Sequence, residues 1–281
     1  MTSANEPFVP EHMNAEPGDF SGNGGRGRFV LMPGSDGRAA QIAERFDGVQ
    51  VKRHPRCHNL YLGSLSTAEG SLDVACISTG MGGASLDIIA NELYALGARR
   101  FLRIGTAGSL QPEVLRTGAV VVPTASVRDE STSLRYLPVE IPATPSVEVL
   151  MASHAEAQAS PFPISFGVIH TKDSLHAREF GAGPMAAENG RFMELLRAGN
   201  VLASEMECAQ LFTLRALWER RQRDEGGPQV QAGAVLAIVG DDAPFAPKED
   251  QSQAIQKAID FALRVVARLE GSARALEKAQ A

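Results

Sequence analysis

Apolar strand-like segments that end in glycine-rich turns restrict the possible folds of this chain more than any other feature. Four of these turns read PGSDGR, STGMGG, RIGTAG and IVGDDAP, and each follows an apolar run. Strand-like and helix-like segments alternate from residue 28 onward, and the sequence contains no internal repeat and no convincing domain boundary. This alternation predicts a single α/β domain with a mixed central β-sheet flanked by helices.

The same pattern predicts where the elements lie. Strands are expected near residues 29–33, 49–51, 60–64, 74–78, 101–105, 118–127, 164–170, 201–204 and 232–240. Helices are expected near residues 38–46, 84–97, 146–158 and 205–221, before Gly199, and from residue 249 onward. Residues 1–27 are rich in Gly, Pro, Asn and Glu, which predicts a flexible N-terminal arm. The folded domain is therefore expected to span residues 28–281.

Composition and charge exclude several classes of protein. With 44% hydrophobic and 21% charged residues, the chain has the balance of a soluble globular protein. No apolar run approaches the ~20 residues that a membrane-spanning helix needs, so no membrane association is expected. The cysteines Cys57, Cys76 and Cys208 form neither a zinc pattern nor a disulfide framework, which favours a cytoplasmic location and no metal. A net charge of −6 argues against nucleic-acid binding, so a few placed basic residues must hold any anionic ligand.

Two of the glycine-rich turns carry an arginine and predict an anion site. In an open α/β sheet, ligands collect beyond the carboxyl ends of the strands, where the turns with Arg38 and Arg103 are expected to converge. A buried arginine such as Arg103 needs an anion or a carboxylate to neutralise it, and the turn at residues 106–108 is expected to add backbone N–H groups. The alternatives are ordinary sheet-to-helix turns and an arginine salt-bridged to a neighbouring strand. None of the turns is a dinucleotide fingerprint or a P-loop.

A pair of acidic residues follows a second buried strand. Glu205 and Glu207 lie at the start of a predicted helix, where the helix dipole stabilises negative charge. A carboxylate held there is a good acceptor for paired hydroxyls, such as the 2′,3′-diol of a ribose. The alternative is simple helix capping, which explains one acid more readily than two.

Six segments together resemble the uridine phosphorylase branch of the nucleoside phosphorylase superfamily. They read PGSDGRAAQIA, STGMGGASLDIIANELYALG, FLRIGTAGSL, GAVVVPTASVRDES, GVIHTKDS and LASEMECAQLF, and the likeness covers residues from about 28 to 215. The resemblance implies a pentosyltransferase that cleaves a ribonucleoside with inorganic phosphate to give free base and ribose 1-phosphate, without metal or organic cofactor. It also implies a homo-oligomer, a dimer or a hexamer, whose active sites are shared between neighbouring subunits.

The resemblance further implies roles for individual residues. The implied phosphate-binding residues are Gly34, Arg38, Arg103 and Thr106, with Arg56 (or its neighbour Arg53) reaching the site of a partner subunit. The implied ribose-binding residues are Glu205, Met206 and Glu207, with His12 reaching the 5′-hydroxyl in the adjacent subunit. The implied base-binding residues are Ala107, Gly108, His176 and Arg178. Arg103, Glu207 and Asp241 are the expected catalytic residues.

Base preference is the point at which the sequence departs from this family. Relatives that use uridine carry a glutamine for the pyrimidine edge, and residues 172–180 contain none. Arg178 is expected to donate to a carbonyl of the base, although a flexible polar loop is an alternative for this stretch. Asp241 either acts as a general acid toward a purine or caps a turn together with Asp242.

The resulting hypothesis favours a uridine-like pyrimidine nucleoside as the substrate. The alternatives are a purine or broad-specificity phosphorylase, a hydrolytic nucleosidase of the same fold, and a catalytically silent nucleoside-binding protein. Arg38, Arg103 and Thr106 count against the nucleosidase, because hydrolysis does not need an anion cradle.

Overall fold

The computed structural model describes residues 8–241 and 245–280, with side chains up to residue 277. Its strands are β1 (Phe29–Met32), β2 (Asp47–Lys52), β3 (Leu60–Thr67), β4 (Gly70–Ile77), β5 (Arg100–Ser109), β6 (Val120–Asp129), β7 (Ile164–Lys172), β8 (Ala203–Glu205) and β9 (Gln231–Gly240). Its α-helices are α1 (Asp36–Ala43), α2 (Gly83–Ala95), α3 (Val147–Ala157), α4 (Leu175–Arg178), α5 (Ala186–Ala198), α6 (Cys208–Glu225) and α7 (Lys248–Gln280). Short 3₁₀ helices span Pro17–Phe20, Asn23–Gly25 and Ser133–Arg135.

The strands form one mixed sheet in the order β2-β3-β4-β1-β5-β8-β7-β6-β9, with an additional pairing between β5 and β9. That pairing closes β5, β8, β7, β6 and β9 into a ring, because β6 also pairs with both β7 and β9. The predicted α/β fold with a mixed central sheet and flanking helices is confirmed. The ring was not expected from the sequence.

Strand β5 is the centre of this arrangement. It runs parallel to β1, with Met32 opposite Arg103, and parallel to β9 along most of its length. At its carboxyl end β5 also pairs in antiparallel fashion with β8, where Gly108 lies opposite Ser204. The carboxyl half of β5 therefore lies between two strands that lead to different loops, which is where an open sheet offers a ligand site.

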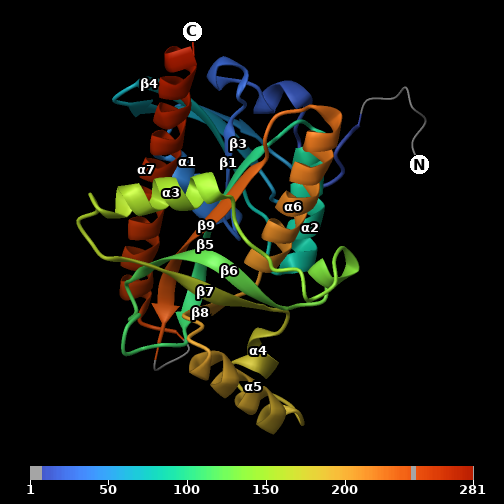
Figure 1. Ribbon diagram of the computed structural model, residues 1–281, viewed down its shortest axis with the longest axis vertical. Helices are drawn as coiled ribbons and strands as arrows, with labels where there is room; N and C mark the ends of the chain where they lie inside the picture. The colour runs from blue at the N-terminus through green and yellow to red at the C-terminus, as the bar shows by residue number, and fades with distance from the viewer. Residues whose placement is uncertain (1–7, 242–244, 281) are drawn as a thin grey trace.

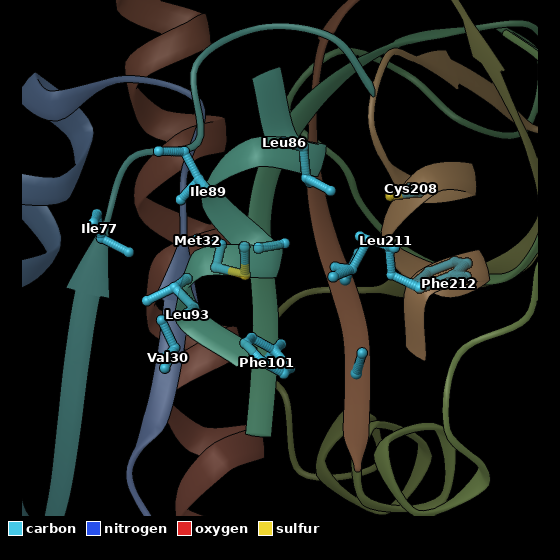
Figure 2. Close-up of a cluster of buried hydrophobic side chains, with 14 of the residues drawn as sticks. Val30, Met32, Ile77, Leu86, Ile89, Leu93, Phe101, Cys208, Leu211 and Phe212 are labelled. Atoms are coloured by element: carbon cyan, nitrogen blue, oxygen red, sulfur yellow. The ribbon is translucent and has the colours of Figure 1, made fainter. Parts of the chain in front are cut away.

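Helices cover the sheet in two layers. Helices α2 and α6 lie on one side, whereas α7 lies on the other (Figure 1). On the α2 face, apolar residues repeat at helical spacing, and Figure 2 shows Ile89 and Leu93 beside Val30 and Met32 of β1. Full burial of a side chain such as Leu93 contributes about 1.5–3 kcal/mol relative to leaving it exposed. The layers thus hold β1 and β5 in place beneath the turns that follow them.

The segment before β1 differs from the flexible arm expected for residues 1–27. Met13 and Phe20 are each only 2% exposed and belong to the core on the α2 side. The side-chain amide of Asn23 donates to the carbonyl of Asp73 (2.9 Å), and the N–H of Asp73 donates to Asn23 Oδ1 (2.8 Å). Residues 8–27 are therefore packed against the domain, because these few side chains anchor a stretch of loop-like composition. Residues 1–7 lie outside the described part of the chain.

No helix in the described ranges is long and apolar enough to cross a membrane.

Candidate active site

The carboxyl ends of β1, β5, β7 and β8 surround a cavity of about 290 Å³. Figure 1 shows α4 and α5 projecting beyond this end of the sheet. The cavity is lined by most of the residues that the sequence singled out: Gly34, Arg38, Arg103, Thr106, Ala107, Gly108, Glu205, Met206 and Glu207. Turns far apart in the sequence thus meet at one place, as predicted.

Arg103 is buried in the wall of this cavity, with a side chain only 4% exposed. Its Nε donates to Glu205 Oε2 (3.3 Å) and its Nη2 donates to Glu207 Oε2. Burial alone would lower the pKa of Arg103, but the carboxylates of Glu207 and Glu205 outweigh it and raise the pKa. The alternative of an arginine salt-bridged to a neighbouring strand therefore accounts for Nε and Nη2. It does not account for Nη1, which is buried and has no hydrogen-bond partner in the described structure.

The absence of a side chain at Gly105 leaves the space that the Arg103 guanidinium occupies. A Cβ on Gly105 would lie 2.9 Å from Arg103 Nη2, which is closer than real Cβ contacts. The guanidinium therefore lies over Gly105, two residues along β5 from its own Cα. Residues 106–108 continue β5 and pair with β9, instead of forming the turn that the sequence suggested. Their N–H groups belong to a strand, so side chains are the main donors available to an anion.

Arg38 supplies a second cation to the same cavity. It lies in the first turn of α1 and is partly buried, and no carboxylate of a described residue lies within ion-pair distance. Burial, followed by repulsion from Arg103, lowers the pKa of Arg38 to about 10, so it stays protonated at neutral pH. Two repelling guanidinium groups and an unpartnered buried nitrogen are the arrangement that an inorganic anion stabilises.

The two acids differ in their surroundings. Glu205 accepts hydrogen bonds from Thr171 Oγ1 (2.5 Å) and from the N–H groups of Glu207 (2.8 Å) and Cys208 (3.0 Å). Burial would raise its pKa, but Arg103, the Thr171 hydroxyl and these N–H groups lower it. Since α6 begins at Cys208, Glu205 is a helix cap as well as a counter-charge for Arg103.

Glu207 is the acid with capacity left for a ligand. Its Oε1 accepts from the N–H of Gly82 (2.6 Å), the residue that directly precedes α2. Burial and the negative charge of Glu205 raise the pKa of Glu207, although Arg103 opposes them. Glu207 accepts hydrogen bonds from fewer groups of the protein than Glu205 does, and it lines the cavity beside Met206.

His12 and Arg56 do not reach this cavity. His12 Nδ1 lies 2.6 Å from Glu92 Oε1 of α2, and the N–H of His12 also bonds to that carboxylate. Arg56 is exposed on the loop between β2 and β3. Their roles in the site of a neighbouring subunit remain predictions.

Of the residues predicted to bind or protonate the base, Ala107 and Gly108 line the main cavity, whereas His176, Arg178 and Asp241 lie outside it. Arg178 donates to both carboxylate oxygens of Asp129 (2.7 Å each) and to Asn189 Oδ1 (2.6 Å), so it is engaged within its own subunit. His176 is exposed, with its ring edge-on to Phe180 at 5.2 Å. Arg178 and Asp241 line an adjoining cavity of about 320 Å³.

Asp241 makes a contact typical of a capping residue. Its Oδ2 accepts from the N–H of Thr117 (3.0 Å). This bond is compatible with the capping alternative, and the position on the adjoining cavity leaves the general-acid hypothesis to experiment. Asp242 lies outside the described residues.

A family model, described as the phosphorylase superfamily, matches residues 28–269 of this chain. The chain belongs to the phosphorylase superfamily. It is similar to the uridine phosphorylase of Treponema pallidum, with 37% identity over 76% of this chain and 78% of the relative. It is also similar to a guanosine phosphorylase of Halorubrum lacusprofundi, with 29% identity over 82% of each chain. The crystal structure of uridine phosphorylase from Vibrio fischeri shares the fold, with a TM-score of 0.69 and 22% identity over 91% of this chain and 93% of that one.

Sequence reasoning missed four polar residues of this phosphorylase cavity, namely Ser35, Lys172, Glu179 and Ser204. Lys172 is the last residue of β7 and follows an apolar run, which is the signal that singled out Arg103. The argument used for Arg103, that a cation at the end of an apolar strand is buried and needs a partner, would also have identified Lys172 at the end of ISFGVIHTK. Glu179 carried no local signal, because its contact with Lys172 depends on how α4 folds back. Among the described residues, no group of three or more His, Cys, Asp or Glu side chains is placed to hold a metal ion.

Proposed function

We propose that this protein is a nucleoside phosphorylase that cleaves a uridine-like ribonucleoside with inorganic phosphate to free base and ribose 1-phosphate. The observation that carries the proposal is the buried Nη1 of Arg103, which has no hydrogen-bond partner among the described residues and lies in a cavity that also holds Arg38 and Glu207. The similarity to proteins named uridine phosphorylase supports the choice of a pyrimidine nucleoside. Phosphate is the co-substrate, and no metal or organic cofactor takes part.

In the proposed mechanism the two ends of the cavity hold the two substrates. Arg38, Arg103 and the Thr106 hydroxyl bind phosphate, since planar guanidinium groups bind phosphate oxygens in pairs. Glu207 accepts from the ribose hydroxyls, and Met206 lies against the sugar. Holding both reactants in one orientation lowers the entropic barrier by several kcal/mol.

The bond changes follow from this placement. The bond between C1′ and the base nitrogen breaks, and its electron pair leaves with the base, so positive charge develops on the sugar as in glycoside cleavage. The phosphate beneath C1′ stabilises that charge and then forms the new bond to C1′. The negative charge on the departing base needs a hydrogen-bond donor. The base then takes up a proton from water, and the phosphate gives its own proton to water as its bond to C1′ forms.

Charge balance supports an oligomer with shared sites. Within one chain, Arg38 and Arg103 are offset by Glu205 and Glu207, so a phosphate dianion would leave the cavity negative. A further cation from outside the chain would correct this, and we propose Arg56 of the partner subunit for that role. This arrangement fits a homo-oligomer, a dimer or a hexamer, that works in the cytoplasm in nucleoside salvage.

A purine nucleoside is the second candidate substrate. A relative named guanosine phosphorylase matches about as much of this chain as the uridine phosphorylases do. Asp241 lines the cavity next to the site, and its carboxyl group in the protonated form would donate a proton to a purine nitrogen if it turned inward.

Substrate assays with and without phosphate test the proposal. Uridine, thymidine, inosine and guanosine are each incubated with the protein, and free base and ribose 1-phosphate are quantified. We expect base release only when phosphate is present, with uridine the best substrate. Release without phosphate would instead identify a nucleosidase, and tight nucleoside binding without turnover would identify a binding protein.

Replacing Arg38 with alanine should reduce kcat/KM for phosphate about 100-fold, because one preorganised donor to the anion is lost. The free energy of unfolding should hardly change, since Arg38 forms no ion pair with any residue that the structure describes. Steady-state kinetics at varied phosphate concentration measure the effect. Arg45→Ala is the matched control, because Arg45 lies just past α1, pairs with Asp260 (3.2 Å) and is outside the cavity. An unchanged KM for phosphate in Arg38→Ala would contradict the assignment.

Replacing Glu207 with glutamine should lower kcat/KM for uridine about 10- to 150-fold, which corresponds to the 1.5–3 kcal/mol of a hydrogen bond to a charged group. The loss should be smaller for 2′-deoxyuridine, since one of the hydroxyls bound by Glu207 is already missing. The ratio of the two losses measures the interaction with the sugar. Equal losses on both nucleosides would show that Glu207 acts only through Arg103.

A further inference from the structure

Lys172 places a third buried cation in the cavity wall, apart from the two arginines. Its side chain is 2% exposed, and its Nζ donates to Ser204 Oγ (2.8 Å) and lies 2.5 Å from Glu179 Oε1. An ammonium group has three N–H donors, and one of them forms the hydrogen bond to Ser204, whereas the contact with Glu179 is an ion pair without hydrogen-bond geometry. N–H donors therefore remain for a ligand, and Lys172 lines the cavity. The steps proposed above for phosphate and ribose do not use this group.

A hydrogen-bond chain fixes the direction of the Lys172 ammonium. Ser204 Oγ accepts from Lys172 and lies 2.9 Å from His170 Nδ1. His170 Nε2 then donates to Asp129 (2.9 Å), which also binds Arg178. Arg178 thus holds Asp129 at the far end of this chain and lines the adjoining cavity.

Glu179 pairs with Lys172 and faces the same space. Its side chain is 17% exposed, and it lines both the main cavity and the adjoining one. A Cβ on Gly108 would lie 3.7 Å from Glu179 Oε2, so this oxygen is near the end of β5, whereas Oε1 is near Lys172. The pair thus presents an acceptor-only carboxylate beside a donor-only ammonium.

The position of the pair along β5 suggests what it binds. The Arg103 guanidinium lies over Gly105 and the Glu179 carboxylate lies near Gly108, three residues farther along the strand. Three residues of a strand span about 10 Å. That distance leaves room for a ribose between a phosphate at the arginines and a base at the Lys172–Glu179 pair.

We propose that Lys172 and Glu179 recognise the base, and that Lys172 stabilises the negative charge on it as it leaves. The inference rests on the proposed phosphorolysis and deepens it. The ammonium donates to a carbonyl oxygen of the base, and the carboxylate accepts from the adjacent ring N–H. This pairing fits bases that carry an N–H next to a C=O, such as uracil. As the bond to C1′ breaks, the electron pair moves onto the base and its charge spreads to the carbonyl oxygen at Lys172.

Leaving-group chemistry provides the test for Lys172. In Lys172→Met, kcat for uridine should fall about 10²- to 10³-fold, as for other lost donors to a developing oxyanion. The fall should be clearly smaller for 5-fluorouridine, whose base carries negative charge more easily and depends less on the ammonium. KM for phosphate should stay within a factor of about two. Lys257→Met is the matched control, because the ammonium of Lys257 donates to the carbonyl of Gly118. An equal fall with both nucleosides would overturn the role.

A second variant tests Glu179 without removing a buried cation. The wild type should cleave uridine at least about 100-fold better than N3-methyluridine, which lacks the ring N–H. In Glu179→Gln that preference should shrink about tenfold or more, because the amide can present its own donor. An unchanged preference would overturn the inference while uridine phosphorolysis by the wild type stands. Wild-type protein without phosphorolytic activity on any nucleoside would instead remove the proposed function.

Discussion

Replacing Arg103 with lysine should lower kcat/KM for phosphate about 10³-fold while the protein stays folded. A lysine keeps one positive charge between Glu205 and Glu207, so the buried carboxylates remain neutralised. It cannot also reach an anion, because its ammonium is a point charge without the planar fork of a guanidinium. Kinetics at limiting phosphate measure the loss, and a urea unfolding curve like that of the wild type is the control. Near-normal turnover of Arg103→Lys at limiting phosphate would show that the anion binds elsewhere.

The structure changes what is expected of the simpler variant. From the sequence, Arg103→Ala is expected to lose phosphate-dependent activity and keep its fold. The contacts of Arg103 contradict the second half, because alanine would leave two buried carboxylates facing each other without a cation. Loss of activity in Arg103→Ala could therefore come from lost phosphate binding or from unfolding. Arg103→Lys separates these two causes, because it keeps the buried positive charge.

The fold and the anion site were accessible from the sequence because both depend on local patterns. Strand and helix periodicity predicted the order of the elements, and the turns carrying Gly34 and Arg103 predicted which ends of the sheet would meet. The rule that buried charges need partners predicted an anion or a carboxylate beside Arg103, and Glu205 and Glu207 lie there.

The remainder depended on contacts between distant residues. Residues 106–108 look like a turn because they are small, but β9 and β8 pair with them on either side and extend β5 to Ser109. Met13 and Phe20 lie in a stretch with the composition of a loop, yet each finds space in the core. Arg178 is predicted from the sequence to donate to the base, yet Asp129, 49 residues away, binds its guanidinium. In each case the deciding partner is absent from the local sequence.

The largest stability effect is expected for Glu205→Ala, with a loss of about 3–5 kcal/mol in the free energy of unfolding at pH 7. The Glu205 side chain is fully buried, and its removal leaves the Arg103 Nε, the Thr171 hydroxyl and the first N–H groups of α6 without their acceptor. Urea unfolding at a fixed protein concentration measures the difference, which keeps any contribution of assembly constant. Glu225→Ala is the control, because the exposed pair of Glu225 with Arg221 contributes about 0.3–0.5 kcal/mol.

The pH dependence of the same variant identifies the charge as the cause. Because the pKa of Glu205 is lower in the folded protein than its usual 4.5, the ionised carboxylate stabilises the fold at neutral pH. That stabilisation is present above pH 4.5 and is lost as the pH falls through the lower folded value. The gap between the wild type and Glu205→Ala should therefore be constant from about pH 6 to 8 and narrow below pH 4.5. A gap that stays the same at low pH would show that Glu205 acts through packing alone, and that Arg103 does not depend on it for neutralisation.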